Sequence, residues 1–448
     1  MNQTLSPKPL GRENRIMVID SLRGMALLGI LMMNIPFFGK AFELHYNLDI
    51  LGEYSGPNYW SWWVVNGLFE GTMRAIFSML FGAGAILLLD RMEKKPLEGI
   101  TPADIYYRRL IWLLIFGLIN AYIFLWPGDI LYTYAITGLF LFPFRKLRAP
   151  KLALFGFAFM VFATIQSTGK FSAAGETRLK GESALIAEKQ NKKLTETQKK
   201  EKAAWIEFQQ EHSKKHYKEK IAESDENMKK GYFEIQSELA SVNKYIETTD
   251  FYTELFFDAL AFFLIGMALF KVRFLTGDRS LQEYAAVAFF AYGIGLPLSY
   301  WIGKTAINNH FDPSLQWQTF NVNLYHVKRF LLAMGHISFV LILYKLRIAN
   351  FLLKLMSNVG QMAFTNYLMQ SLICTFLFYG YGFGLFGQLE RYQLYEVVAA
   401  IWLFQIVFSA IWLQFFRFGP FEWVWRSLTY WTRQPFLKDQ GSKIGAEN

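Results

Sequence analysis

Cysteine is almost absent from this sequence. Its one cysteine, Cys374, lies in an apolar run and has no partner for an intrachain disulfide or a cysteine-based metal site. The first apolar run holds Arg23 and lacks a small-residue cleavage site after it, so a removable signal peptide fits poorly. The sequence therefore predicts no disulfide scaffold and no metal centre, and it predicts that the first run is a permanent membrane span.

Charged residues are also scarce. They make up 18% of the 448 residues, against 53% hydrophobic residues, whereas a typical soluble domain has about 25% charged residues. Apolar runs long enough to cross a bilayer, about 20 helical residues, recur along the chain. These runs are continuous rather than alternating, which favours helices over a barrel. The predicted fold class is all-α, a polytopic integral membrane helix bundle embedded in the lipid bilayer.

The apolar runs predict about ten transmembrane helices. The expected spans are 17–38, 70–90, 107–125, 128–144, 150–167, 253–271, 282–302, 324–345, 360–379 and 393–415. Basic residues gather before the first span and in alternate connections after it, so the positive-inside rule places both termini in the cytoplasm. The net charge of +10 follows from this topology and does not indicate nucleic-acid binding.

The segments around these spans divide the chain. Residues 1–16 form an N-terminal cytoplasmic segment, 17–169 hold spans one to five, and 251–415 hold spans six to ten. Between them, residues 170–250 are rich in Lys, Glu and Gln and lack proline, which predicts an extracytoplasmic insert of one or two long helices. Residues 416–448 combine tryptophans with a Glu422 and Arg426 pair, as an interfacial helix and tail would.

Ionisable residues inside spans are costly, so each is a candidate functional group. In the first span, Asp20 and Arg23 are three residues apart and Asn34 lies almost three turns further on the same face. In the second span, Glu70 and Arg74 are four residues apart. Both sets fit either a substrate-binding stripe or structural ion pairs.

A second group of candidates is drawn from the later spans. Asp129 begins a helix after a turn, where capping is the simpler role, and Asn120 and Trp126 could share a cavity with it. His326 and His336 are the two histidines expected within the membrane, where histidine suits proton transfer or a hydrogen bond between helices. Asn366 and Gln370, four residues apart, fit helix adhesion or a cavity wall.

Long motifs carry a family resemblance. The segments IDSLRGMALLGILMMN, RRLIWLLIFGLINAYIFLWPGDILYTYAITG and VGQMAFTNYLMQSLICTFLFYGYGFGLFG resemble the bacterial YeiB family, whose carboxy-terminal half is a domain of unknown function, number 418. The resemblance covers nearly every span, and the charged insert is its most divergent part. It implies a multi-pass protein of the bacterial inner membrane whose family has been described loosely as transport-related.

The D-x-x-R-G opening of the first span is also similar to membrane acyltransferases, including the heparan-alpha-glucosaminide N-acetyltransferase family and bacterial O-acyltransferases. In the bacterial enzymes a histidine follows the arginine by eleven positions, where this chain has Asn34. Many YeiB relatives have histidine where this chain has Asn120. The resemblance therefore implies a functional role for Arg23 and a shared helix scaffold. It does not imply a proton acceptor at position 34, because asparagine cannot act as a general base.

Three functions are consistent with the sequence: an acyltransferase, a transporter and a membrane scaffold. As an acyltransferase, the chain would bind no resident cofactor but would take acyl-CoA as co-substrate, with Arg108, Arg109 and Arg145 on the donor. Arg23 and Arg74 would bind phosphate or developing charge, and Asp129, His326 or His336 would act as base. As a transporter, the polar stripe would line the path of a small polar or anionic solute. As a scaffold, the insert would bind partners, and association of two copies is left open.

Overall fold

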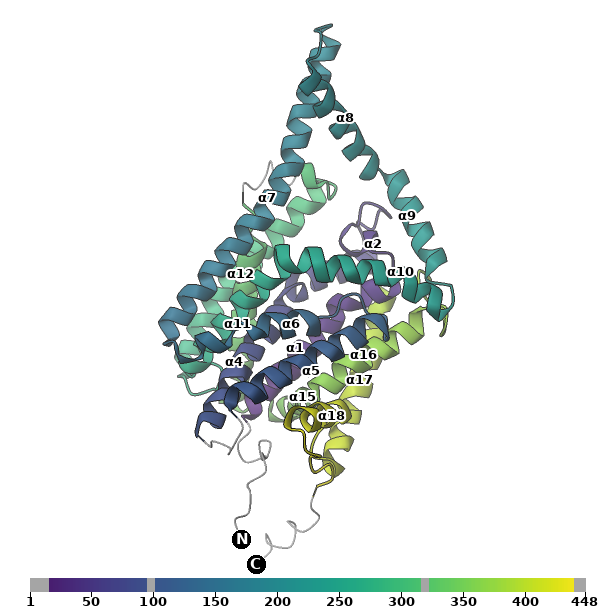
Figure 1. Ribbon diagram of the computed structural model, residues 1–448. Helices are drawn as coiled ribbons and strands as arrows, with labels where there is room; N and C mark the ends of the chain where they lie inside the picture. The colour runs from purple at the N-terminus through teal and green to yellow at the C-terminus, as the bar shows by residue number, and fades with distance from the viewer. Residues whose placement is uncertain (1–15, 95–100, 316–321, 439–448) are drawn as a thin grey trace, which may run out of the picture.

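The computed structural model describes residues 16–94, 101–315 and 322–438. Every regular secondary-structure element in these residues is a helix (Figure 1). The prediction of an all-α bundle with a helical insert is confirmed. The predicted segment 1–16 lies outside the described residues except for Ile16, and so does the end of the predicted tail, 439–448.

The bundle is built from helices of very unequal length. Their bounds are α1 Met17–Gly39, α2 Glu43–Tyr46, α3 Gly56–Val64, α4 Thr72–Lys94, α5 Pro102–Tyr122, α6 Leu131–Leu139, α11 Phe256–Lys271, α12 Leu281–Asn308, α14 Tyr325–Leu346, α15 Asn350–Gln361, α16 Ala363–Phe378, α17 Arg391–Phe415 and α18 Pro420–Tyr430. A π-helical turn, Val65–Phe69, joins α3 to the approach to α4. The helix α1 is mostly buried, whereas α12 and α17 present most of their surface outward.

Seven helical runs among the described residues are long and apolar enough to cross a membrane. They are Met17–Gly39, Gly56–Lys94, Ala149–Lys189, Tyr232–Lys271, Leu281–Asn308, Tyr325–Leu346 and Arg391–Phe415. The expected span 128–144 differs, because α6 has nine residues and is about 14 Å long. A 3₁₀ turn with Pro143 follows it. The helix α6 is therefore too short to cross a bilayer core about 30 Å thick.

Four glycines bring helix backbones into direct contact. An added Cβ on Gly24 of α1 or on Gly360 of α15 would lie 2.0 or 1.9 Å from a carbonyl oxygen of the other helix. An added Cβ on Gly82 of α4 or on Gly266 of α11 would lie 2.1 or 2.0 Å from a carbonyl oxygen in the same reciprocal way. Small residues allow this close approach in membranes. The two crossings fix α15 and α11 against the centre of the bundle.

Replacing Gly360 by alanine is expected to lower the free energy of unfolding by about 1–3 kcal/mol, because the new methyl group overlaps backbone that cannot move aside. The matched control is Gly293→Ala in α12, where nothing lies within 4 Å of the added Cβ. That change is expected to be neutral or to stabilise by about 0.5–1 kcal/mol. Thermal unfolding in detergent measures both. Equal melting temperatures for the two variants would contradict the crossing.

The insert continues the bundle helices rather than starting at a separate boundary. The helix α7, Ala149–Lys189, runs without a break from the expected fifth span into the insert. Three further helices complete it: α8 Glu196–Glu211, α9 Lys214–Asn227 and α10 Tyr232–Tyr245. Figure 1 shows α7 rising away from the bundle, α8 and α9 returning, and α10 running across the bundle end. The helix α10 then passes through a π-helical stretch, Ile246–Leu255, into α11.

Polar contacts hold the returning side of the insert to the bundle. The Asp49 carboxylate, in the loop before α3, lies 2.8 Å from Nζ of Lys214 and 3.0 Å from Nδ1 of His310. Partial burial raises the pKa of Asp49, but hydrogen bonds from Lys214, Tyr54 and His310 outweigh it and lower the pKa to about 2. Asp49 is therefore ionised at neutral pH and anchors the start of α9.

Candidate functional site

A cavity of about 260 Å³ lies between α1, α4, α5, α6, α16 and α18, with Ile16 and Tyr430 at its edge. The first and last described helices therefore meet at one end of the bundle. Three groups of side chains line the cavity. The charged end consists of Asp20, Arg23, Arg109, Glu422 and Arg426; the apolar wall includes Phe77, Leu80, Phe81, Leu88, Leu110 and Leu113; and the tyrosine end consists of Tyr134 and Tyr367.

The helix α5 runs along the cavity. Arg109 lies at the charged end, Leu113 is the last α5 residue on the cavity wall, and Gly117, one turn further, packs against Asp129 behind the tyrosine end. Arg109 and Gly117 are eight residues apart, which corresponds to about 12 Å along a helix. A ligand that touches both ends therefore needs a charged group and an extended apolar part.

The charged end holds its arginines in place through aromatic and carboxylate contacts. Nη1 of Arg23 lies 2.6 Å from Oδ1 of Asp20. The guanidinium of Arg109 lies 3.8 Å from the centre of the Trp425 ring, and Nε1 of Trp425 donates to the Arg109 carbonyl at 2.9 Å. Such stacking leaves guanidinium N–H groups free to point at a ligand. With three arginines and two carboxylates, this end favours anions.

Glu422, the second carboxylate of the charged end, is committed to structure. Its Oε1 accepts hydrogen bonds from the backbone N–H groups of Phe364 and Thr365, at 2.7 and 3.1 Å. Burial raises the pKa of Glu422, and these donors act against that shift. Glu422 thus caps the start of α16, beside the break that separates α15 from α16, and fixes α18 against the bundle.

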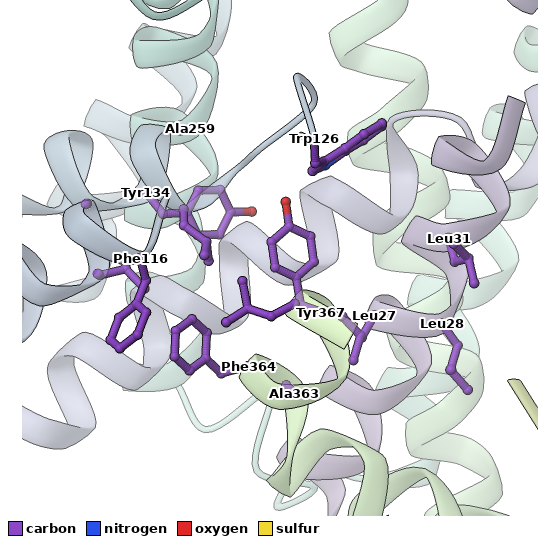
Figure 2. Packing of buried hydrophobic residues seen from close by; sticks show 14 of the residues in the cluster. Leu27, Leu28, Leu31, Phe116, Trp126, Tyr134, Ala259, Ala363, Phe364 and Tyr367 are labelled. Atoms are coloured by element: carbon purple, nitrogen blue, oxygen red, sulfur yellow. The ribbon is translucent and has the colours of Figure 1, made fainter. Parts of the chain in front are cut away.

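The tyrosine end is backed by a buried carboxylate. Oδ1 of Asp129 accepts from Nδ2 of Asn120 at 2.8 Å and from the Tyr367 hydroxyl at 3.3 Å. Its Oδ2 accepts from the Tyr132 backbone N–H at 2.9 Å, so Asp129 also caps α6, as its position in the sequence predicts. Figure 2 shows Tyr134 and Tyr367 side by side, with Trp126 beyond them. Asp129 can therefore exchange a proton with the cavity through the Tyr367 hydroxyl.

Two donor or acceptor atoms behind the tyrosine end have no partner among the described residues. They are Oδ1 of Asn120 and Nε1 of Trp126, and both are buried. The Trp126 ring stacks on Phe38, with centroids 3.9 Å apart. Buried polar atoms without a partner are uncommon in proteins and mark places where a ligand or water can bind.

Several predicted site residues gather here. Asp20, Arg23 and Arg109 line the cavity, and Asn120, Trp126 and Asp129 lie directly behind its tyrosine end. The predicted donor-binding arginines separate, because Arg108 stacks on Trp431 and Arg145 pairs with Glu93, and neither lines the cavity.

A separate set of buried charges lies between α4, α11 and α14. We call Glu70, Arg74, Asp258, His326, Lys328 and Arg329 the buried charge cluster. Asp258 is its centre: Oδ1 lies 2.6 Å from Nη1 of Arg329 and 3.2 Å from Nδ1 of His326, and Oδ2 lies 3.7 Å from Nη2 of Arg74. Asp258 therefore joins three cationic or titratable groups from two other helices.

Glu70 has a different set of partners in the same cluster. It accepts from the Tyr325 hydroxyl at 2.8 Å and lies 3.4 Å from Nζ of Lys328. Arg74 pairs with Asp258 instead. The expected local pair between Glu70 and Arg74 is thus replaced by pairs across helices.

The remaining candidates make structural hydrogen bonds. The His336 ring is bonded on both sides, to the Tyr292 hydroxyl at 2.7 Å and to the Leu68 carbonyl at 3.0 Å. Asn366 and Gln370 of α16 bond to Ser409 and Gln405 of α17. Asn34 is half-buried in α1 and does not line the cavity. These contacts favour helix adhesion for Asn366 and Gln370.

Sequence reasoning missed the partners that complete both sites. Asp258 stands alone at the head of an apolar run, and Tyr134 and Tyr367 are two of 23 tyrosines. One pattern in the sequence could have pointed to the tyrosine end: Tyr367 and Ser371 are four residues apart and form a polar stripe on one helix. Among the described residues, no three His, Cys, Asp or Glu side chains are placed to hold a metal ion.

Together, fold and site define a polytopic α-helical membrane protein with a cavity that runs from a charged end to a tyrosine end. Residues 269–432 match the family described as a protein of unknown function, DUF418. The chain is 30% identical to the uncharacterised protein YxaH of Bacillus subtilis (strain 168), over 97% of this chain and 98% of YxaH. It is 28% identical to the uncharacterised protein YeiB of Escherichia coli (strain K12), over 93% and 96%.

The chain belongs to the YeiB family. A third relative, an uncharacterised 39.9 kDa protein of Bacillus acidopullulyticus, is 27% identical over 96% of this chain and 98% of the relative. No solved structure gives a significant match.

Proposed function

We propose that this protein is a membrane acyltransferase that takes an acyl group from acyl-CoA and passes it to a hydroxyl or amine acceptor. The cavity is the observation that supports this function. Its arginines suit the phosphates of coenzyme A, its apolar wall suits the pantetheine arm and acyl chain, and its tyrosine end offers proton-transfer groups. An elongated donor with a charged group at one end fits a cavity whose arginines and tyrosines lie at different ends.

In the proposed step, the acceptor O–H or N–H attacks the thioester carbonyl carbon at the tyrosine end. The Tyr134 hydroxyl donates to the developing oxyanion. Tyr367 takes the acceptor proton while passing its own proton to Asp129. The C–S bond breaks as the C–O or C–N bond forms. The proton returns from Asp129 through Tyr367 to the thiolate, which leaves as coenzyme A.

The proposed topology places the charged end at the cytoplasmic face of the bacterial inner membrane. The basic connections predict cytoplasmic termini, and Ile16 and Tyr430 edge the cavity at this end. Acyl-CoA is a cytoplasmic metabolite class, so it would reach the arginines directly. The acceptor would then approach from the face that carries the insert.

Donor binding tests the proposal with two adjacent arginines. Arg109→Ala is expected to weaken the binding of labelled acetyl-CoA to protein in nanodiscs by about 10- to 100-fold, because a charged hydrogen-bond donor is lost from the charged end. Arg108→Ala is the matched control, since Arg108 stacks on Trp431 outside the cavity. We expect the control to stay within about twofold of the original protein.

Two results would contradict the proposed acyl transfer. Wild-type protein that neither binds acetyl-CoA nor transfers its acetyl group, but moves a small anion across proteoliposomes, would favour transport. Equal losses for the Arg108 and Arg109 variants would mean that general surface charge, not the cavity, attracts the donor.

A further inference from the structure

The buried charge cluster holds more basic than acidic side chains. Arg74, Lys328 and Arg329 are basic, and the two arginines stay charged, whereas Glu70 and Asp258 are its carboxylates. The side chains of Lys328 and Arg329 are 6% and 0% exposed. An unbalanced charge inside a membrane protein is costly, so such charges usually have a functional partner.

Two donors of the cluster are unused. Nη2 of Arg329 and Nε of Arg74 are buried and have no hydrogen-bond partner among the described residues. The other nitrogens of Arg329 are occupied, since Nη1 pairs with Asp258 and Nε donates to the Gly71 carbonyl at 3.0 Å. A guanidinium with a free N–H group is suited to accept one more anionic oxygen.

The cluster also has one accessible member. The Arg74 side chain is 30% exposed, although its partner Asp258 is 8% exposed. Tyr46, whose hydroxyl lies 3.4 Å from Oε1 of Glu70, is 43% exposed and belongs to α2, which contacts α9 of the insert. Arg74 is thus the most exposed member of the cluster, and Tyr46, next to Glu70, belongs to an element that contacts the insert.

Tyr134 connects this cluster to the cavity. Its ring lines the tyrosine end, and its hydroxyl lies 2.6 Å from Oγ of Ser78 and 3.4 Å from the Arg74 carbonyl oxygen. Tyr134 therefore contacts both the cavity and the backbone of the residue whose side chain belongs to the cluster.

We infer that Arg74 and Arg329, supported by Lys328, bind an anionic group of the acyl acceptor, a phosphate or a carboxylate. This assignment of acceptor class rests on the proposed acyl transfer, whereas the anion site itself does not. The acceptor enters from the insert side, its anionic group pairs with the two free guanidinium donors, and its hydroxyl or amine reaches the tyrosine end.

Phosphate binding tests the site directly. Equilibrium dialysis with radiolabelled inorganic phosphate is carried out on protein in nanodiscs. Arg74→Gln is expected to weaken one class of phosphate site by about tenfold or more, and Glu70→Gln is expected to strengthen it, because the second change removes a competing carboxylate. Arg108→Gln is the control and leaves this class unchanged. Opposite signs for Arg74→Gln and Glu70→Gln cannot arise from general unfolding.

Acceptor choice tests the assignment to the acceptor. Acetyl transfer from acetyl-CoA is compared with glucosamine 6-phosphate and with glucosamine, which differ only in the phosphate. Arg74→Gln is expected to raise KM for glucosamine 6-phosphate by about tenfold and to leave KM for glucosamine within about twofold. Phosphate binding that Arg74→Gln leaves unaltered would overturn the anion site. Transfer whose KM for glucosamine 6-phosphate is insensitive to Arg74→Gln would overturn the anionic acceptor. A protein that binds phosphate at Arg74 but transfers to neither amine would keep the site and contradict the proposed function.

Discussion

Replacing Asp129 by asparagine is expected to lower the rate of acetyl transfer from acetyl-CoA by about 10²- to 10⁴-fold, the usual contribution of a general base. Asparagine keeps the size of the side chain and can still cap α6 through the Tyr132 N–H. It cannot accept the proton that Tyr367 passes on. The measurement is the release of coenzyme A thiol under saturating donor, with glucosamine and with glucosamine 6-phosphate as acceptors.

Two controls separate chemistry from folding in this experiment. Acetyl-CoA affinity of the Asp129→Asn variant should stay within about twofold of wild type, because Asp129 packs against Gly117, about 12 Å along α5 from Arg109 of the charged end. The melting temperature should also stay close to wild type. Tyr367→Phe should lower the rate as well, since it breaks the path to Asp129. An Asp129→Asn variant that transfers acetyl groups at the wild-type rate would exclude Asp129 as the base.

Local patterns predicted the part of the site that is local in the chain. Asn120 and Asp129 are nine residues apart, across a turn, and their hydrogen bond follows from that short connection. The start of α6 also follows from sequence, because Asp129 caps it. Hydropathy alone missed how short α6 is, because the residues after it are apolar as well.

Partners that are distant in sequence could not be predicted in the same way. The spacing of Glu70 and Arg74 suggests a pair within one helix, yet each pairs with another helix. In a packed bundle, the nearest opposite charge decides the pairing, and Asp258 and Lys328 are more than 180 residues away along the chain. Glu422 caps α16 from a position 58 residues after Phe364 for the same reason.

Neighbouring arginines show the limit of charge patterns. Arg108 and Arg109 are equivalent in any count of basic residues, and both agree with the positive-inside rule. On a helix they point about 100° apart, so only Arg109 reaches the cavity while Arg108 lies against Trp431. Which of them can bind a donor depends on the rotation of α5, and Trp425 of α18 fixes that rotation.

The largest stability effect is expected at Asp258. Replacing it by alanine leaves Arg329, His326 and Arg74 without their shared carboxylate, and removing one partner of a buried ion pair typically costs about 3–5 kcal/mol. Glu93→Ala is the matched control, because the Glu93 and Arg145 pair is exposed and such pairs contribute about 0–1 kcal/mol.

Thermal and denaturant unfolding in detergent measure the effect of Asp258→Ala. Adding Arg329→Met to Asp258→Ala should recover part of the loss, because the strongest unpaired charge is removed together with its partner and an apolar side chain takes its place. A double variant that is less stable than Asp258→Ala alone would contradict the ion pair as the cause. Inorganic phosphate should also raise the melting temperature of Asp258→Ala more than that of wild type, since the variant has one more uncompensated positive charge beside Arg74. A larger stabilisation of Asp258→Ala by phosphate would show that the same charges determine both the stability of the cluster and its binding of anions.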